Sequence, residues 1–211
     1  MGNINIDFLV DDLKPVRLVK SSTAFLLAMA LTGVIALLIA ATIGVRPDVA
    51  AADPATILLV RSGTLLLLGF ATLQALALSA RPGVGTQNNG WKWILAVAGL
   101  FPIATFFSWL QAKPIFFAAA SSPSAVWCLG ISLSSALVVG TALTIWLRRG
   151  APVSINRSSL LVGLAAGSFG TFCYNLYCPS QSIEYVGIWY GLSVALSAGA
   201  GRLIIPRFIR W

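Results

Sequence analysis

Three cysteines are the side chains of this sequence with the most chemistry open to them. Cys173 and Cys178 lie in the stretch TFCYNLYCPSQSIEYVGIWY at residues 171–190, and Cys128 lies farther upstream. The chain contains no histidine, which excludes Ser-His and Cys-His catalysis and any metal site built on imidazole. It has no Cys-x-x-Cys pair and no glycine-rich phosphate loop, so nothing indicates a thioredoxin-like protein or an ATPase. The open alternatives for the thiols are a disulfide, a soft metal ion and simple packing.

The elements that position these thiols are predicted to be membrane helices. Of the 211 residues, 58% are hydrophobic and 9% are charged, against roughly 25% charged in a soluble domain. Six apolar runs each approach the ~20 residues that cross ~30 Å of hydrocarbon. The first is longer than the ~7 to 15 residues of a signal-peptide core, which favours an uncleaved helix over a cleaved signal. The runs are residues 21–45, 62–80, 94–110, 125–147, 159–176 and 186–205.

The predicted architecture is therefore an all-α, polytopic six-helix transmembrane bundle. Residues 21–211 form the membrane domain, and residues 1–20 form a cytoplasmic segment that binds a partner. Of the 14 basic residues, all but Arg46, Arg61 and Lys113 fall on one side if the N-terminus is inside. This bias predicts that both termini are cytoplasmic. Arg61 and Arg202, near helix ends, are predicted to reach the lipid headgroups.

The same topology places all three thiols toward the outer, oxidising side of the membrane. A bond between Cys128 and Cys178 is chemically allowed there, and on the chain-entropy estimate closing its loop of about 50 residues is worth about 3 to 5 kcal/mol. Cys178 precedes Pro179 in a short polar loop, where packing demands little of it. Arg46 is distant in sequence, so nothing nearby is expected to make Cys178 a strong thiolate. Cys173 is interpreted as a packing residue with an accessory role left open. A metal site stays unknown, with Cys128 and Cys178 the candidate soft-metal ligands.

Aromatic and glycine patterns add two expectations. Six aromatic residues near the cysteines are predicted to form an interfacial belt with their rings toward lipid. The steps Gly163/Gly167 and Gly187/Gly191 predict close packing of the last two spans as an antiparallel hairpin. The six aromatic residues are Trp127, Tyr174, Tyr177, Tyr185, Trp189 and Tyr190.

The segment before the first span has the pattern of a short amphipathic helix. Ile6, Leu9, Val10 and Leu13 follow i, i+3, i+4, i+7 spacing and share one face. Such a helix is too short to be stable alone in water. Its acidic residues disfavour an anionic membrane surface and favour a basic or grooved protein partner over the inner leaflet. The predicted contact residues are Leu9, Asp11, Asp12 and Leu13.

Two stretches near the C-terminus, CPSQSIEYVGIWYGL and GRLIIPRFIRW, resemble the NrsF-type membrane anti-sigma factors. The resemblance covers the whole chain and is most specific at Cys178-Pro179, Ser182, Trp189-Tyr190 and Arg210-Trp211. Two departures, Tyr177 in place of a frequent histidine and Ser180-Gln181 in place of an acidic pair, weaken any expectation of metal ligands beyond the thiols.

The resemblance implies an inner-membrane protein that holds an extracytoplasmic-function (ECF) sigma factor at the cytoplasmic face. It also implies that oxidative or heavy-metal stress releases the sigma factor. The family's paired outer cysteines would fall on Cys128 and Cys178. The function expected is regulation, with no enzymatic activity, no cofactor and no direct nucleic-acid contact. The alternatives are a membrane thiol-disulfide oxidoreductase and a small solute transporter or channel, the latter disfavoured because no Asp or Glu falls within a predicted span.

Overall fold

The computed structural model describes most of the chain, and every element within that part is a helix. The predicted N-terminal contact residues Leu9, Asp11, Asp12 and Leu13 lie outside the described residues, and so does most of the predicted third span. The described residues are 20–51, 53–80, 94, 96–99, 103, 106–107, 109–110, 124–150, 152, 154–178, 180 and 182–209.

Four of the helices are long and apolar enough to cross a membrane, namely Ser21–Thr42, Thr56–Ser79, Ser124–Leu147 and Val186–Ile209. They correspond to four predicted spans, with shifted boundaries. The second span was predicted at residues 62–80, whereas the helix already begins at Thr56. The predicted start was too late because Arg61 interrupts the apolar run in the sequence. The last helix was predicted to end at residue 205, yet it continues through Pro206 to Ile209. The elements are α2 (Ser21–Thr42), α3 (Pro47–Ala50), α4 (Thr56–Ser79), α7 (Ser124–Leu147), α8 (Ile155–Asn175), α9 (Ile183–Tyr185), the π-helix η1 (Val186–Tyr190) and α10 (Gly191–Ile209).

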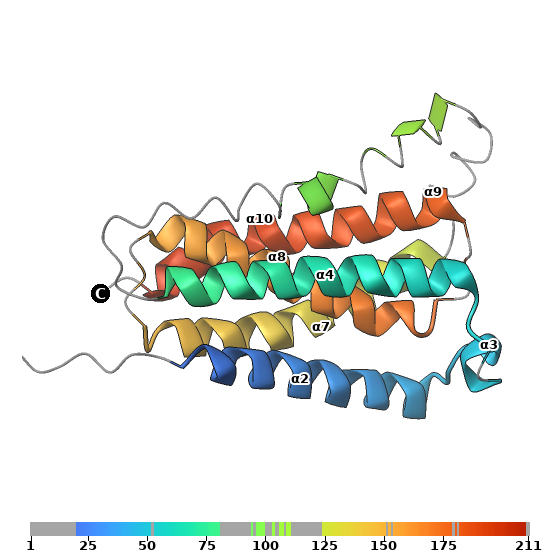
Figure 1. Ribbon diagram of the computed structural model, residues 1–211, viewed down its shortest axis with the longest axis horizontal. Coiled ribbons are helices and arrows are strands. Elements are labelled where there is room, and N and C mark those ends of the chain that lie inside the picture. The colour runs from blue at the N-terminus through green and yellow to red at the C-terminus, as the bar shows by residue number, and fades with distance from the viewer. Residues whose placement is uncertain are drawn as a thin grey trace, which may run out of the picture.

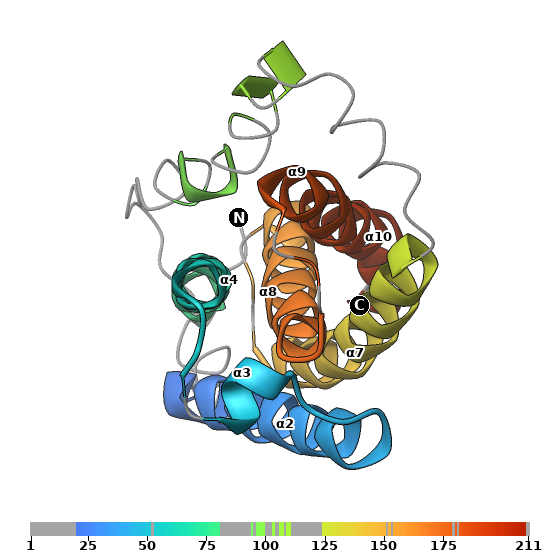
Figure 2. The ribbon, with the colours of Figure 1, turned by 90° about the vertical axis from the view of Figure 1, so that its right-hand side faces the viewer.

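Helix α8 occupies the centre of the bundle, where α4, α7 and α10 surround it (Figure 2). It fulfils the prediction of a helix at residues 159–176, but it is not among the four apolar helices. Fourteen of its 21 residues are buried, and many of these are Ser, Gly or Ala. A helix that faces other helices rather than lipid needs small side chains for close packing more than it needs hydrophobicity.

The close packing of α8 depends on its glycines. A Cβ atom at Gly163 would lie 2.4 Å from the Ser197 carbonyl oxygen of α10, and one at Gly167 would lie 2.8 Å from the Ser197 Cβ. Gly170 faces α7 instead, since its Cβ would lie 2.5 Å from the Ser132 carbonyl oxygen. The predicted tight hairpin of the last two helices is therefore confirmed at Gly163 and Gly167.

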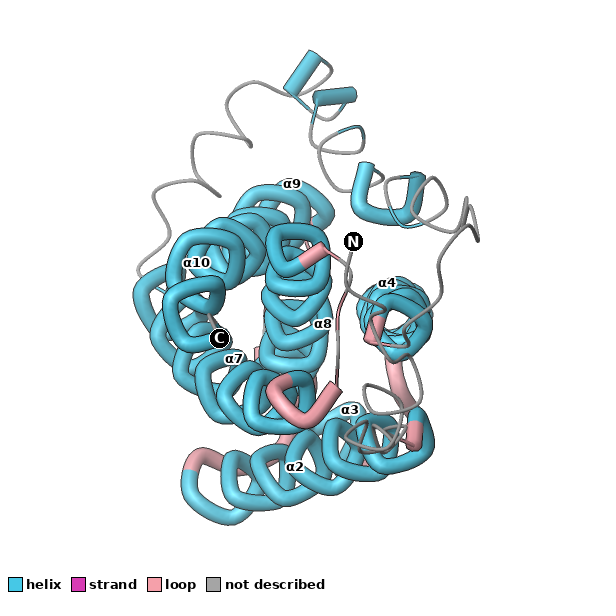
Figure 3. Tube along the Cα trace, turned by 90° about the vertical axis from the view of Figure 1, so that its left-hand side faces the viewer, coloured by secondary structure: helices cyan, strands magenta, loops and turns pink. Residues whose placement is uncertain are grey.

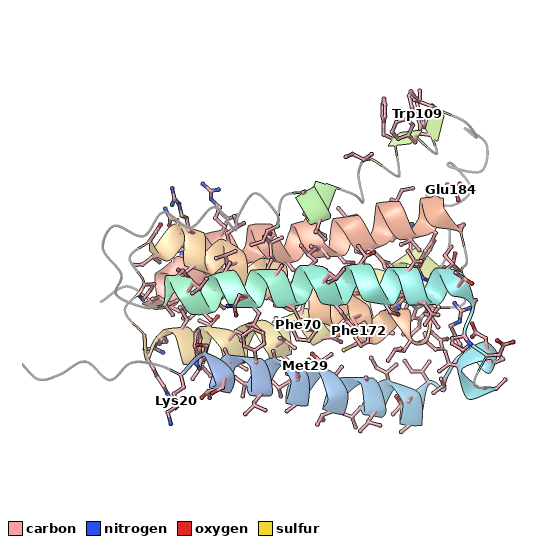
Figure 4. The ribbon with its side chains drawn as sticks, viewed as in Figure 1. Lys20, Met29, Phe70, Trp109, Phe172 and Glu184 are labelled. Atoms are coloured by element: carbon pink, nitrogen blue, oxygen red, sulfur yellow. The ribbon has the colours of Figure 1, made fainter. Side chains whose placement is uncertain are left out.

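The long helices lie side by side along the bundle, which therefore has two distinct ends (Figures 1 and 3). Lys20 before α2 and Glu184 in α9 lie at opposite ends (Figure 4). We call one end the basic end, and it carries Lys20, Arg148, Arg149, Arg157 and Arg207. We call the other the cysteine end, and it carries Arg46, Arg61, Cys128, Cys178 and Glu184.

Two contacts fix the direction of α4 and α7. Ser79 at the end of α4 lies 3.0 Å from the Ser158 hydroxyl near the start of α8, at the basic end. Gly150, just after α7, lies against Ala80 at that same end. Both helices therefore run from the cysteine end to the basic end, and Ala80 and Ser124 lie at opposite ends of the bundle.

Candidate sensor site at the cysteine end

All three cysteines are free and fully buried. Cys128 lies near the start of α7, Cys173 near the end of α8, and Cys178 in the loop that follows α8. The loop position was expected to leave Cys178 with little packing, and that expectation is wrong. Cys178 is buried because its backbone N–H bonds the Tyr174 carbonyl oxygen, which continues the last turn of α8 and turns the residue inward.

Cys128 and Cys178 come together in one buried cluster, which we call the tyrosine cluster because Tyr174, Tyr185 and Tyr190 surround the thiols. Both thiols are fully buried within it. Two cysteines far apart in sequence thus share one pocket of side chains contributed by α7, α8 and the last helix. The proposed pairing of these residues stays a prediction.

Cys173 points elsewhere. Its thiol lies 3.6 Å from the Thr32 carbonyl oxygen on α2, in position to donate a weak hydrogen bond there. It is fully buried and lies outside the tyrosine cluster. This placement agrees with the interpretation of Cys173 as a packing residue.

The backbone of Cys178 is held by Arg46, which sequence reasoning dismissed as distant. Helix α2 ends at Thr42, and Gly44 follows it with a φ of 102°, which suits a residue without a Cβ and redirects the chain. Arg46 Nη1 then donates to the Cys178 carbonyl oxygen at 2.9 Å. Its Nε and Nη2 donate to the two carboxylate oxygens of Asp48 at 2.8 and 2.7 Å. This bidentate pair fixes the guanidinium plane.

Arg61 of α4 contacts the same loop at a second point. Its Nη1 donates to the Ser180 carbonyl oxygen at 2.7 Å, and its guanidinium carbon lies 5.8 Å from the centre of the Tyr190 ring. The side chain is 4% exposed, so the prediction that Arg61 reaches the lipid headgroups is wrong. The loop carbonyl and the ring keep it inside the bundle.

A third link joins α4, α8 and η1. Asn175 Nδ2 donates to the Ser62 hydroxyl at 2.7 Å, and the Tyr190 hydroxyl donates to Asn175 Oδ1 at 3.3 Å. Tyr190 ends the five-residue π-helix η1, an irregular turn of the kind often found at functional sites. The cysteine end is thus a connected polar network inside an apolar bundle.

The predicted aromatic belt is only partly present. Trp127 is exposed as expected, with 68% of its surface accessible, but Tyr174, Tyr185 and Tyr190 are buried. The rings of these tyrosines pack around the thiols rather than facing lipid. Their hydroxyl groups made an interfacial position plausible from sequence. In the structure Tyr190 instead bonds Asn175 and packs its ring against Tyr174 within the bundle.

The donor set does not favour a resident metal ion. No group of three or more Cys, Asp, Glu or His side chains converges within the part of the chain that the structure describes. Arg46 and Arg61 both contact the loop of Cys178, but the Asp48 carboxylate balances the charge of Arg46. A soft cation would find only the two thiols as ligands there and would meet repulsion from the Arg61 guanidinium.

The Arg46–Asp48 pair predicts a specific response to acid. Hydrogen bonding to Arg46 lowers the pKa of Asp48 from 3.8 to about 2. Because the folded-state pKa is depressed, the stability from this pair is present above the ordinary carboxylate pKa and is lost as the pH falls toward the folded value. The difference in melting temperature between wild type and Asp48→Asn should therefore stay constant from about pH 7 to about pH 5 and shrink toward about pH 2. A difference that already disappears near about pH 5.5 would contradict the pairing.

Comparison with known proteins identifies the family of this chain. The family described as "NrsF: Negative regulator of sigma F" matches residues 9–211. The "Probable anti-sigma-F factor NrsF" of Azospira oryzae is 27% identical over 182 residues, which covers 83% of this chain and 82% of the relative. The "Anti-sigma-F factor NrsF" of Caulobacter vibrioides is 29% identical over 202 residues, which covers 88% of this chain and 87% of the relative. No solved structure gives a significant match. The chain belongs to the NrsF family of negative regulators of sigma F.

Proposed function

We propose that this protein is an anti-sigma factor of the bacterial inner membrane. It holds an ECF sigma factor inactive at the cytoplasmic face and releases it when oxidative or heavy-metal stress changes Cys128 and Cys178. Membership of the NrsF family and the anti-sigma-F names of its relatives support the regulatory role. The observation that carries the sensing role is the burial of two cysteines, distant in sequence, in one tyrosine cluster.

The proposed topology has six crossings with both termini in the cytoplasm. The four apolar helices and the central α8 account for five of these crossings. The passage between Ala80 and Ser124 supplies the sixth, because α4 and α7 run in the same direction. The concentration of Lys and Arg at the basic end supports a cytoplasmic position for that end, while the cysteine end faces the oxidising side.

The chemical step of the proposal is formation of a disulfide. Cys128 and Cys178 each lose a proton and together give two electrons to an oxidant, for example a hydroperoxide, which leaves as an alcohol and a water molecule. A bond between the two sulfur atoms requires a Cα separation of roughly 4.4 to 6.8 Å and a restricted dihedral angle. The residues of α7, α8 and η1 around the thiols must then repack. The charge of Arg61, which has no carboxylate partner among the described residues, favours oxidants over metal cations as the direct signal.

The burial of the thiols disfavours the alternative of a thiol-disulfide oxidoreductase. Such an enzyme presents a reactive cysteine to its substrate, whereas both Cys128 and Cys178 are fully covered. Because both thiols are fully buried, the proposed switch requires the tyrosine cluster to open far enough to admit a small oxidant, but not a protein substrate. This contrast favours switching over turnover.

A pull-down from gently solubilised membranes tests the proposal. The full chain should retain its sigma factor, and a variant lacking residues 1–15 should lose it, because the contact is proposed at Leu9, Asp11, Asp12 and Leu13. Replacing Asp11 and Asp12 by Asn is the finer test, since it leaves the length and the apolar face intact. If the full chain retains no sigma factor under any condition, the proposed function is wrong.

A further inference from the structure

Helix α2 is the least embedded of the long helices. Of its 22 residues, Ala24, Ala28, Thr32 and Ile39 are buried, and three of these four are small. Helix α8, by comparison, buries most of its length. Phe25, Leu31 and Ile35 of α2 also pack against the core, but these side chains are only partly buried. Helix α2 is therefore held less firmly than α8 and is the long helix most free to shift along the bundle.

The cysteine end of α2 is nevertheless tied to the candidate sensor. Arg46 follows α2 by a few residues and donates to the carbonyl oxygen of Cys178 itself. The bidentate bond to Asp48 at the start of α3 holds the guanidinium rigid, so Arg46 behaves as part of the α2–α3 connection. Any movement of the Cys178 backbone therefore acts directly on the end of α2.

Helix α4 is tied to the same loop in a different way. Arg61 bonds Ser180, and Ser62 bonds Asn175. Neither bond involves the backbone of Cys178, and α4 is wedged against α8, where Phe70 meets Phe169 edge to face. The loop can thus move at Cys178 while α4 keeps its place.

We infer that Arg46 is a positioning residue that couples Cys178 to α2. When Cys178 is drawn toward Cys128 on α7, its carbonyl moves or turns, and the Arg46–Asp48 unit either follows it or is released. Since α2 is a rod of about 33 Å, the displacement reaches Lys20 at the basic end. Residues 1–20 continue directly from that point, so this inference, which rests on the proposed function, links the sensor to the proposed sigma contact.

The test separates sensing from transmission in cells that carry a sigma-dependent reporter. A maleimide of high mass, applied after an acid quench, measures the fraction of protein with Cys128 and Cys178 oxidised after diamide treatment. The variants are Arg46→Gln, Arg46→Lys as the conservative rescue, and Arg202→Gln as a matched control on the exposed surface of α10. Membrane levels are measured for each.

Arg46→Gln should oxidise as wild type does, yet its reporter induction should fall about fivefold or more, a change in the range of ordinary allosteric coupling. Arg46→Lys should recover part of the induction, and Arg202→Gln should match wild type. Equal induction in Arg46→Gln and wild type overturns the inference. The proposed function is contradicted by a different result, namely normal reporter induction in Cys178→Ser.

A second variant covers the case in which Arg46→Gln does not accumulate in the membrane. Asp48→Asn keeps the guanidinium and the donor to Cys178 but removes the carboxylate that holds it rigid. Induction should drop, with unchanged thiol oxidation and a smaller effect than in Arg46→Gln. Wild-type induction in Asp48→Asn would show that the rigid Arg46–Asp48 unit transmits nothing.

Discussion

Replacing Cys128 or Cys178 by serine should abolish release of the sigma factor on oxidation. The wild-type reporter should rise about 5- to 150-fold, which corresponds to a coupling free energy of about 1 to 3 kcal/mol. Each single variant lacks one sulfur atom of the proposed disulfide, so its reporter should stay at the uninduced level before and after diamide. Reporter transcription and sigma-factor retention are measured in the same cultures.

Cys173→Ser is the matched control for this prediction. Cys173 is as buried as the other two cysteines, but it bonds α2 at Thr32 and lies outside the tyrosine cluster. Its serine variant should therefore keep the response. A normal response in Cys128→Ser and Cys178→Ser would contradict the proposed sensing role. A response lost only in Cys173→Ser would instead place the sensor at the contact of Cys173 with α2.

Adding a single methyl group at Gly163 or Gly170 should strongly destabilise the bundle. The new Cβ would lie 2.4 Å from the Ser197 carbonyl oxygen in the first case and 2.5 Å from the Ser132 carbonyl oxygen in the second. Both obstacles are backbone atoms, so helices must separate to make room. Overpacking of this kind costs about 1 to 3 kcal/mol or more. Gly163→Ala and Gly170→Ala should lower the midpoint of thermal aggregation in detergent.

Gly199→Ala provides the control within the same pair of helices. Nothing lies within 4 Å of a Cβ at Gly199, and Ala is the better helix former in water by about 1 kcal/mol. Its midpoint should match or exceed that of wild type. If Gly163→Ala and Gly199→Ala were equally stable, the close contact between α8 and α10 would be incorrect.

The sequence was most informative about the helices and their close packing. Long apolar runs predicted α2, α4, α7 and the last helix, and the Gly163/Gly167 step predicted the contact between α8 and α10. Hydropathy did not predict the central position of α8. A helix surrounded by other helices need not be strongly apolar, so its hydropathy does not distinguish it as the centre of the bundle. Its many Ser, Gly and Ala residues were the available signal.

The candidate site was predicted in its thiols but not in its supports. Topology placed Cys128 and Cys178 on one side, and the structure brings them into one cluster. Arg46 and Arg61 were missed because each bonds a backbone carbonyl more than 100 positions away along the chain. Every residue has a backbone carbonyl oxygen, so the residue type at the acceptor position gives no sign of such a bond. No pair of opposite charges in the sequence therefore indicated either contact.

The most direct test of the central claim combines the pull-down with thiol trapping. Cells are treated with diamide, free thiols are capped at once, and the tagged protein is purified and separated into its reduced and oxidised forms. The account predicts that the sigma factor accompanies the form with free Cys128 and Cys178 and is absent from the form that contains their disulfide. Equal amounts of sigma factor on both forms would contradict it.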